Sequence, residues 1–585
     1  MSILATGFAM HRATLSVVTF VLFFPDLSGA EPQKASQLLP RTTVLYAELP
    51  DPLELISAIF DHPLRQKIEA LEPYKQAIRT EQYRAFLTGR KFVEIQVGME
   101  WREALETLTA QGVFFGVDAE TQGVAMLIHA KDAESLELFR TKLLELTKLG
   151  KNPNQVREAD YRGVTAYEVN KARFAVVEDW LLITNNPETG KAVLDRLLDG
   201  QGDCLADDET FQLATSSRPA DASGWAFGNL KLLREAGIAA KLFEGRSGNP
   251  AVELLVGGIL STLQQTPFAT AGIVASPEAF SLQLSVPHDA EWVPEEREFY
   301  FGPDGLGRAP ALPQAAETLF TLSAYRDVSE MWIRAGDLFN EQINDGFAEA
   351  DASLTTLFAG KDFGEDILGS LTPEIGFIAT RQNFADVLPV PAIKLPQFAL
   401  VVQLKDPESM TRELRRTFQS MVGFFNVLGA MEGRPQLEMN MEKLDSGAEL
   451  ITSVYVPEAD DAESTQADIL FNFAPSVGFA NERFVVASTD RLARELVQSD
   501  TMTNIEPDAN TDVRLQLPVL KQVLDDNRDQ LISQNMLEEG HSREEAEAAI
   551  GLLLEVVGYF REASIRLDAA GNQLAVKFQV RVKQD

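Results

Sequence analysis

Strict alternation of apolar and polar residues marks the clearest strands that the sequence predicts. Residues 280–286 (FSLQLSV) and 574–582 (LAVKFQVRV) place an apolar side chain at every second position. Successive side chains of a strand point to opposite faces of a sheet, so this period of two indicates strands with one buried and one wet face. The stretches that follow residues 131 and 405 are instead typical of amphipathic helices.

The same series of elements occurs twice along the chain. Residues 124–130 (VAMLIHA) precede a KDAES turn and a helix to Leu149, and residues 398–404 (FALVVQL) precede a KDPES turn and a helix to Leu428. The predicted order in each copy is strand, helices, hairpin, long helix, hairpin, helices, strand, helix, hairpin. Matches in a common order indicate a duplication.

These patterns predict an α+β protein of two tandem related modules, each with a mostly antiparallel sheet packed by helices. Module one is predicted at residues 31–287 and module two, its repeat, at residues 312–585. Between them, residues 288–311 are rich in Pro and Gly, which predicts a linker with little regular structure. We expect the helices of each module to cover one sheet face, and the other face to meet solvent or the partner module.

The two KD-x-ES turns have a structural explanation. Asp132 and Asp406 each stand just before a predicted helix, where the carboxylate can accept a backbone N–H bond. Ala133 and Pro407 both suit the first helical position. We therefore interpret the aspartates as helix caps rather than as a ligand site.

The first thirty residues have the pattern of a signal peptide. Arg12 precedes the apolar run 15–24 (LSVVTFVLFF), and Ser28-Gly29-Ala30 supplies small residues before a cleavage point. The run has about half of the twenty residues that a spanning helix needs, and no later stretch is long and apolar enough to span a bilayer. We expect an exported chain, periplasmic or extracellular, with no transmembrane segment after cleavage.

The charge of the chain restricts its partners. The formal net charge is −35, and nucleic acids are bound by Lys and Arg side chains that displace counterions from phosphates. Nucleic acid is therefore excluded as a partner, and a general attraction of the chain to anionic lipid surfaces is disfavoured. High net charge also keeps proteins apart in solution.

Motifs for catalysis or cofactor binding are not found. His62, His129, His288 and His541 stand far apart, so no Cys/His zinc spacing occurs, and there is no G-x-S-x-G nucleophile motif. Residues 185–192 (NNPETGKA) lack the first Gly and the final Ser or Thr of a phosphate-binding loop. Residues 508–512 (DANTD) begin like an EF-hand loop but lack its Gly and its final Glu. We assign no catalytic, cofactor-binding or metal-binding residue, and no cofactor.

The single cysteine and the tryptophans remain as possible contact residues. Cys204 is the only cysteine, so an internal disulfide is impossible, and its acidic neighbours predict an unreactive thiol. Trp180 and Trp225 fall in strand patterns and are predicted to be core residues. Trp292, in the linker beside residues 299–301 (FYF), is the best candidate for an exposed aromatic contact, although packing against a module is favoured.

The LP-x-x-T segment at 39–43, the KD-x-ES elements and the signal peptide together resemble exported bacterial two-module proteins built from domains of unknown function. Such a family implies a cell-envelope or secreted protein and supplies no catalytic residues.

Three functions remain open. The first is a non-catalytic binding or scaffold protein of the cell envelope, with a protein or small-molecule ligand in the cleft between modules. The second is a hydrolase of envelope glycans that uses two carboxylates, which predicts two acids with raised pKa values. The third is a carrier for an apolar ligand, which predicts a large dry cavity. We rank binding first because catalytic motifs are missing.

Overall fold

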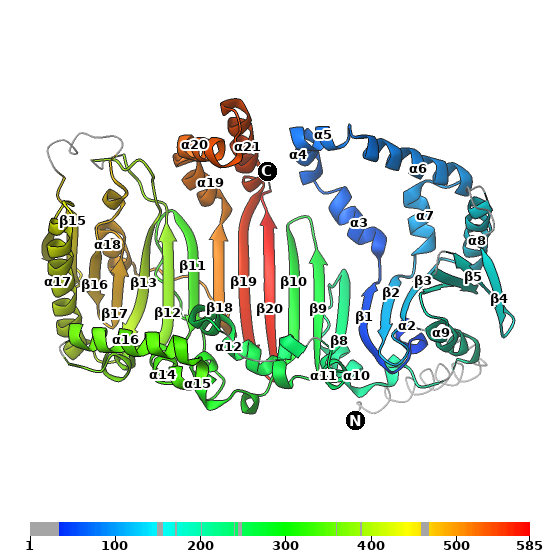
Figure 1. Ribbon diagram of the computed structural model, residues 1–585, viewed down its shortest axis with the longest axis horizontal. Coiled ribbons are helices and arrows are strands. Elements are labelled where there is room, and N and C mark those ends of the chain that lie inside the picture. The colour runs from blue at the N-terminus through cyan, green and yellow to red at the C-terminus, as the bar shows by residue number, and fades with distance from the viewer. Residues whose placement is uncertain are drawn as a thin grey trace, which may run out of the picture.

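Figure 1 shows the computed structural model of the protein, which describes residues 34–148, 156–169, 172–200, 202–238, 240–243, 248–358, 360–385, 389–457 and 467–584. The signal peptide predicted at residues 1–30 lies outside the described residues. The chain is 45% helix and 29% strand, and the predicted α+β class is confirmed. Within the described residues the strands join into one sheet of 20, and every pairing between them is antiparallel.

The first half of the chain supplies one end of this sheet. Its strands are β1 (Thr43–Leu49), β2 (Val113–Asp118), β3 (Val124–His129), β4 (Arg157–Tyr161), β5 (Val164–Val169), β6 (Ala172–Val177), β7 (Trp180–Thr184), β8 (Gly224–Asn229), β9 (Phe268–Ala275) and β10 (Ala279–Pro287). Its helices are α2 (Ala35–Leu38), α3 (Pro52–Phe60), α4 (Leu64–Ala70), α5 (Glu72–Ala77), α6 (Glu81–Val97), α7 (Trp101–Leu108), α8 (Ala133–Lys148), α9 (Pro187–Asp199), α10 (Glu209–Ser216), α11 (Leu230–Glu235) and α12 (Pro250–Gln265).

The second half supplies the other end. Its strands are β11 (Thr318–Tyr325), β12 (Leu371–Thr380), β13 (Gln397–Leu404), β14 (Leu437–Lys443), β15 (Glu449–Tyr455), β16 (Ser476–Ala480), β17 (Arg483–Ala487), β18 (Ala509–Gln516), β19 (Phe560–Ala570) and β20 (Gln573–Val582). Its helices are α14 (Val328–Ile333), α15 (Ala335–Leu338), α16 (Glu341–Leu357), α17 (Pro407–Met431), α18 (Asp490–Gln498), α19 (Leu517–Asp526), α20 (Arg528–Glu539) and α21 (Arg543–Val557).

The strands of the two halves follow the same order outward from the middle of the sheet. One half runs β10-β9-β8-β1-β2-β3-β7-β6-β5-β4, and the other runs β20-β19-β18-β11-β12-β13-β17-β16-β15-β14. The halves meet where β10 pairs with β20, and Leu282 there lies opposite Phe578. They are therefore joined edge to edge, so of the two alternatives expected for the open sheet face, solvent or the partner module, the partner module is ruled out. A free sheet edge on each half favours this arrangement, because pairing satisfies its open N–H and C=O groups.

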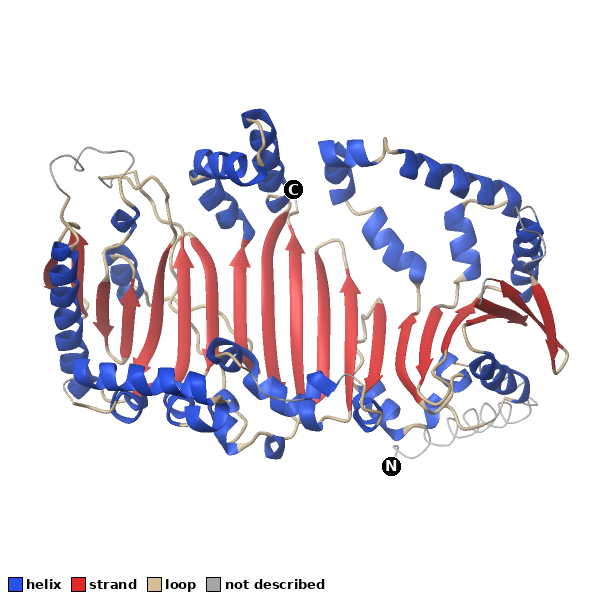
Figure 2. Cartoon of the chain, viewed as in Figure 1, coloured by secondary structure: helices blue, strands red, loops and turns tan. Residues whose placement is uncertain are grey.

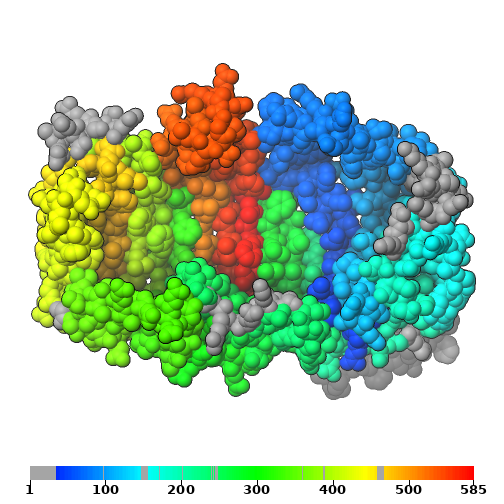
Figure 3. All heavy atoms as spheres, viewed as in Figure 1, coloured from blue at the N-terminus to red at the C-terminus, as the bar shows by residue number. Residues whose placement is uncertain are grey.

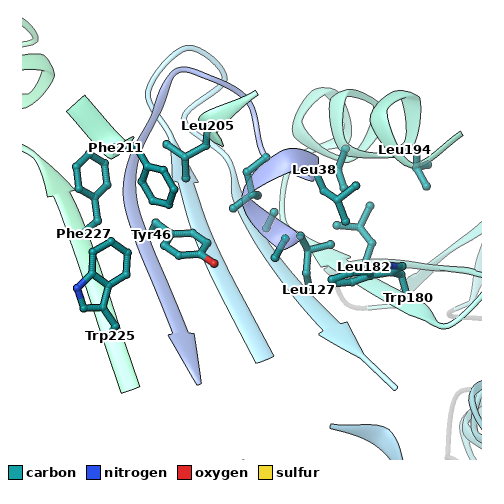
Figure 4. Close-up of a cluster of buried hydrophobic side chains, with 14 of the residues drawn as sticks. Leu38, Tyr46, Leu127, Trp180, Leu182, Leu194, Leu205, Phe211, Trp225 and Phe227 are labelled. Atoms are coloured by element: carbon teal, nitrogen blue, oxygen red, sulfur yellow. The ribbon is translucent and has the colours of Figure 1, made fainter. Parts of the chain in front are cut away.

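Helices lie on both faces of the sheet, which also differs from the sequence-based expectation. We call the face that carries Leu282 and Phe578 the front face, and the opposite one the back face. The back face of the first half is covered by α10 over Tyr46, Trp225 and Phe227, and by α2 and α9 beside Leu127 and Leu182 (Figure 4). The rings of Tyr46 and Phe211 meet edge to face with centroids 5.3 Å apart. Trp180 and Trp225 are buried, as predicted.

Short-range signals in the sequence explain where many of these elements begin and end. Asp132 Oδ1 accepts the backbone N–H of Ser135 at 2.8 Å, and Asp406 caps α17 with Pro407 at its first position, so both predicted caps are confirmed. Asn186 likewise caps α9. The two-residue turn between β4 and β5 is Arg162-Gly163, with φ angles of 55° and 85°. Two successive left-handed residues are what a tight hairpin turn requires.

The predicted linker forms ordered structure. It contains two short 3-10 helices, Ala290–Trp292 and Glu295–Arg297, followed by α13 (Glu298–Phe301). All three aromatic side chains of α13 are almost wholly buried, whereas Trp292 is only half-buried. They pack between α12 of the first half and β19, β20, α14 and α15 of the second. The segment is thus a core that joins the halves, because its apolar residues outweigh the local Pro and Gly content.

Candidate functional site

The front face has an apolar floor. Nine adjacent strands of the described sheet each contribute one apolar side chain to a row that runs across the strands, and each member lies directly opposite the next in register. Six of these side chains remain 36–44% exposed. The row comprises Ile273, Leu282, Phe578, Ile565, Val513, Leu322, Phe377, Leu400 and Val486.

Helices border this floor above and below. In Figures 1 and 2, α12 lies along the lower ends of the central strands and α14–α16 along those of the neighbouring strands of the second half, and α3–α5 and α19–α21 lie near the upper ends. The central strands β10, β19 and β20 are visible at the bottom of a recess between these helices (Figure 3). Exposed apolar surface of this extent is unusual on a protein that has nothing to bind.

The helices α3–α7, residues 52–108, form an arch at one end of this recess. Neither α5 nor α7 has a buried residue, and α6 has none among its described side chains. Large apolar side chains are exposed instead, including Phe86 at 62%. Helices gain most of their stability from the packing of an apolar face. Leu64 and Leu108 at its two ends reach core clusters, but between them the arch presents large apolar side chains that remain exposed.

Beneath the arch lies an apolar chamber of about 750 Å³. Its walls come from α6, α7 and α8, and its floor from β3, β5, β6 and β7. Arg90, Glu94 and Thr109 are the only polar residues among those that line it. The apolar lining includes Phe86, Val93, Leu105, Phe139, Leu143 and Ile183.

A second chamber of about 960 Å³ adjoins the first, and we call it the mixed chamber. Trp101 and Arg90 line both chambers and so stand at the boundary between them. The mixed chamber lies between the arch and the ends of β10, β19 and β20, with Phe280 and Val580 in its wall. It also carries charged groups. Apolar and polar ends thus meet in one continuous hollow, which consists of the two chambers together.

The charged groups of the mixed chamber form ion pairs. Arg102 donates two hydrogen bonds to Asp61, at 2.9 and 2.8 Å, and these bonds hold the pKa of that carboxyl below its usual range. Arg65 Nε donates to Glu69 at 2.6 Å, which raises the pKa of the guanidinium. Arg90 Nε lies 3.3 Å from Glu94.

The local sequence sets up the arch. Thr80 caps α6 by accepting the N–H of Tyr83 at 3.3 Å, and Gly98 ends the helix in the left-handed region with a φ of 80°. Tyr83, Phe86, Arg90 and Val93 follow one another three or four residues apart and all line the hollow. This stripe is the sequence signal that could have indicated the site. Without its partners in view, such a stripe reads as an ordinary core-facing helix.

The histidines lie apart in space as well as in sequence. Buried His62 accepts the N–H of Leu64 through Nδ1, and His288 Nδ1 lies 2.9 Å from the hydroxyl of Thr262. His129 stacks on Trp180 with centroids 3.9 Å apart. No group of three or more His, Cys, Asp or Glu residues in the described ranges could hold a metal ion.

The remaining sequence candidates have structural roles. Cys204 is buried and unpaired, and burial together with a hydrogen bond to Asp207 raises the pKa of its thiol, the direction that the acidic neighbours predict. In the partial EF-hand motif, Asp512 pairs with Arg514 at 2.7 Å, and Asn510 donates to the carbonyl of Tyr300. Of these side chains, Asn510 connects β18 to α13 at the junction of the two halves.

The carboxylates give no support to the hydrolase hypothesis, which needs acids with raised pKa values. Among the described carboxyls, each pKa that clearly departs from its ordinary value is lowered. The cause is a hydrogen bond from a neighbouring group, as from Arg494 to Glu442 and from Arg162 to Asp199.

Among the residues that the structure describes, no helix is long and apolar enough to cross a bilayer.

Comparison with known proteins gives little guidance. No family model matches the sequence, and no curated protein matches it. Among solved structures, crystal forms III and I of TP0453 align over 44% of this chain and 80% and 79% of theirs, with 11% identity and a TM-score of 0.23. A similarity this weak carries no argument about fold or function.

Proposed function

We propose that the protein is a non-catalytic binding protein of the cell envelope that carries an apolar ligand, and that the ligand is an acyl chain held in the hollow beneath the arch. The observation that carries this proposal is the apolar chamber, in whose walls the helices α6 and α7 have no buried residue among their described side chains. The binding function ranked first from the sequence thus combines with the carrier alternative.

Size and lining favour a chain-like apolar ligand. Both chambers fall within the range of small-molecule sites, roughly 300–1,000 Å³. The apolar chamber offers almost nothing for a sugar or a nucleotide to hydrogen-bond with, and burying unpaired polar groups is costly. Each methylene that leaves water contributes about 0.8 kcal/mol, so an acyl chain gains affinity along its whole length.

We further propose that the chain is exported through cleavage of residues 1–30 and acts in the periplasm or outside the cell. The n-region, the apolar run and the small residues before Glu31 support export. We also propose that residues 31–287 and 312–585 are related tandem modules of one duplicated ancestor. The shared order of strands in the two halves supports this duplication.

Filling the apolar chamber tests the proposed ligand. Ala104 lines the chamber from α7, so Ala104→Trp places an indole where the chain would lie. If the indole keeps two or three methylenes of the acyl chain out of the chamber, binding weakens by roughly 15- to 60-fold. The measurement is a titration with a dansyl-labelled fatty acid, followed by its fluorescence.

Ala85→Trp is the matched control, because Ala85 is exposed on α6 and outside the hollow. We expect its affinity to equal that of the unaltered protein. An unaltered protein that binds no fatty acid contradicts the proposal, and so does equal binding by the two tryptophan variants.

A further inference from the structure

We propose that the ligand is an anionic amphiphile, with its acyl chain in the apolar chamber and its carboxylate or phosphate head group in the mixed chamber, beside Arg65 and Arg90. This assignment rests on the proposed function and adds the class of head group. Its basis is the division of the hollow into an apolar end and a charged end. An amphiphile has the same division.

The middle of the arch, α4–α6, departs from the charge of the chain as a whole. The chain has 87 acidic and 52 basic residues, whereas residues 64–97 have seven basic residues and four acidic ones. Those residues comprise α4–α6, which roof the mixed chamber. The whole-chain charge, which predicts repulsion of anionic lipids, therefore does not describe this surface. Fields in a cleft depend on the groups that line it.

Three guanidinium groups but only two carboxylates line the mixed chamber. Arg65, Arg90 and Arg102 outnumber Asp61 and Glu69 there. Arg102 is committed to its two hydrogen bonds with Asp61, which tie α7 to the end of α3. Arg65 and Arg90 each lie beside a glutamate of their own helix, four residues along the chain. Counted over the whole hollow, Glu94 balances the third arginine. The guanidinium groups of Arg65 and Arg90 nevertheless have more donors than one glutamate uses, so they can also form strong paired hydrogen bonds with a carboxylate or phosphate.

The position of Arg90 sets the orientation of the ligand. Its side chain lines both chambers, so it stands where a chain leaving the apolar chamber would end. The neighbouring Tyr74 and Tyr83 line the mixed chamber and can donate hydroxyl hydrogen bonds to head-group oxygens. The head group thus meets charge at the boundary, and beyond it the chain meets apolar side chains apart from Glu94 and Thr109.

The test compares two lipids that differ only in their head groups. Dioctanoyl phosphatidylglycerol and dioctanoyl phosphatidylcholine are titrated as monomers into the full chain by calorimetry. Charged hydrogen bonds contribute about 1.5–3 kcal/mol each, so we expect about tenfold or greater preference for the anionic lipid. Glycerol phosphate, which has the anion but no chain, is expected to show no heat of binding.

Two double variants show which arginines produce the preference for the anionic lipid. Arg65→Gln/Arg90→Gln removes the head-group arginines and should reduce the preference to within about twofold. Its affinity for phosphatidylcholine should stay unchanged, which shows that the hollow is intact. Arg79→Gln/Arg84→Gln removes two charges from the same helical region, outside the residues that line the hollow, and should keep the preference. Arg90→Gln alone serves if the first double variant does not fold.

The outcomes separate the two proposals. Equal affinity of the unaltered protein for both lipids overturns the head-group assignment and leaves the acyl-chain proposal standing. Equal loss of preference in both double variants also overturns it, because the effect then comes from a diffuse field. Binding to anionic vesicles without binding of the lipid monomers overturns it in favour of a membrane surface. If neither lipid nor the dansyl fatty acid binds, the proposed function itself fails.

Discussion

Replacing Arg297 with Met is expected to destabilise the protein by about 3–5 kcal/mol. The side chains of Glu253 in α12 and Arg297 are 0% and 6% exposed. Arg297 donates to both oxygens of Glu253, at 2.6 and 3.1 Å, and to the hydroxyl of Ser261 at 3.0 Å. Without the guanidinium, Glu253 stays buried with no opposite charge, and this desolvated carboxylate is the source of the loss. Urea unfolding followed by tryptophan fluorescence measures the shift in midpoint.

Two further variants show that the loss comes from the orphaned charge. Glu253→Met/Arg297→Met removes both charges and should recover most of the stability, since apolar residues of similar size often replace a buried ion pair without loss. Arg543→Ala breaks the exposed pair with Glu547 and should leave the midpoint unchanged, because surface pairs contribute little. If Arg297→Met unfolds at the same urea concentration as the unaltered protein, this explanation of the junction is wrong.

Replacing Tyr300 with Ala is also expected to lower the free energy of unfolding strongly, by about 3–5 kcal/mol. The ring is fully buried, and it lies so close to α12 that a Cβ on Gly258 would come within 2.4 Å of it. The guanidinium of Arg326, at the end of β11, lies 3.5 Å from the ring centroid. Truncation would leave a cavity between α12 and the second half and would remove this cation–π contact.

Tyr300→Phe separates the ring from the hydroxyl. The hydroxyl donates to the carbonyl of Leu255 at 2.6 Å, and loss of one such bond costs about 1 kcal/mol. We therefore expect the phenylalanine variant to unfold close to the unaltered protein and the alanine variant far below it. The same urea titration decides the matter. Equal destabilisation by the two variants would show that the hydrogen bond, and not the packing, holds the junction.

Local signals in the sequence predicted the elements well, and the long-range arrangement poorly. The caps at Asp132 and Asp406 and the alternation along β10 and β20 involve residues close in the chain, so a single sequence contains them. The pairing of β10 with β20 joins residues about three hundred positions apart, and an alternating strand does not specify its partner. Packing of the linker against a module was favoured from the sequence, but its regular structure was not predicted, because Pro and Gly around α13 are typical of irregular chain.

The candidate site was beyond the reach of the sequence for the same reason. A large dry cavity was predicted only as a consequence of the carrier hypothesis, and no residue was assigned to it. Phe86 and Phe139 line one chamber but lie on different helices, and Leu181 comes from a strand. An apolar stripe on a helix reads the same whether it faces a core or a hollow. Only the fold shows that α6 and α7 cover a hollow.

Native mass spectrometry of the full protein, purified from its source without detergent, tests the central claim most directly. We predict a population whose mass exceeds the chain by that of one amphiphile, released when the protein is denatured in organic solvent. Ala104→Trp, prepared in the same way, should lack this excess, and Ala85→Trp should keep it. A bare chain in all three preparations, or an identical mass excess in all three, would contradict the assignment of the hollow as an acyl-chain site.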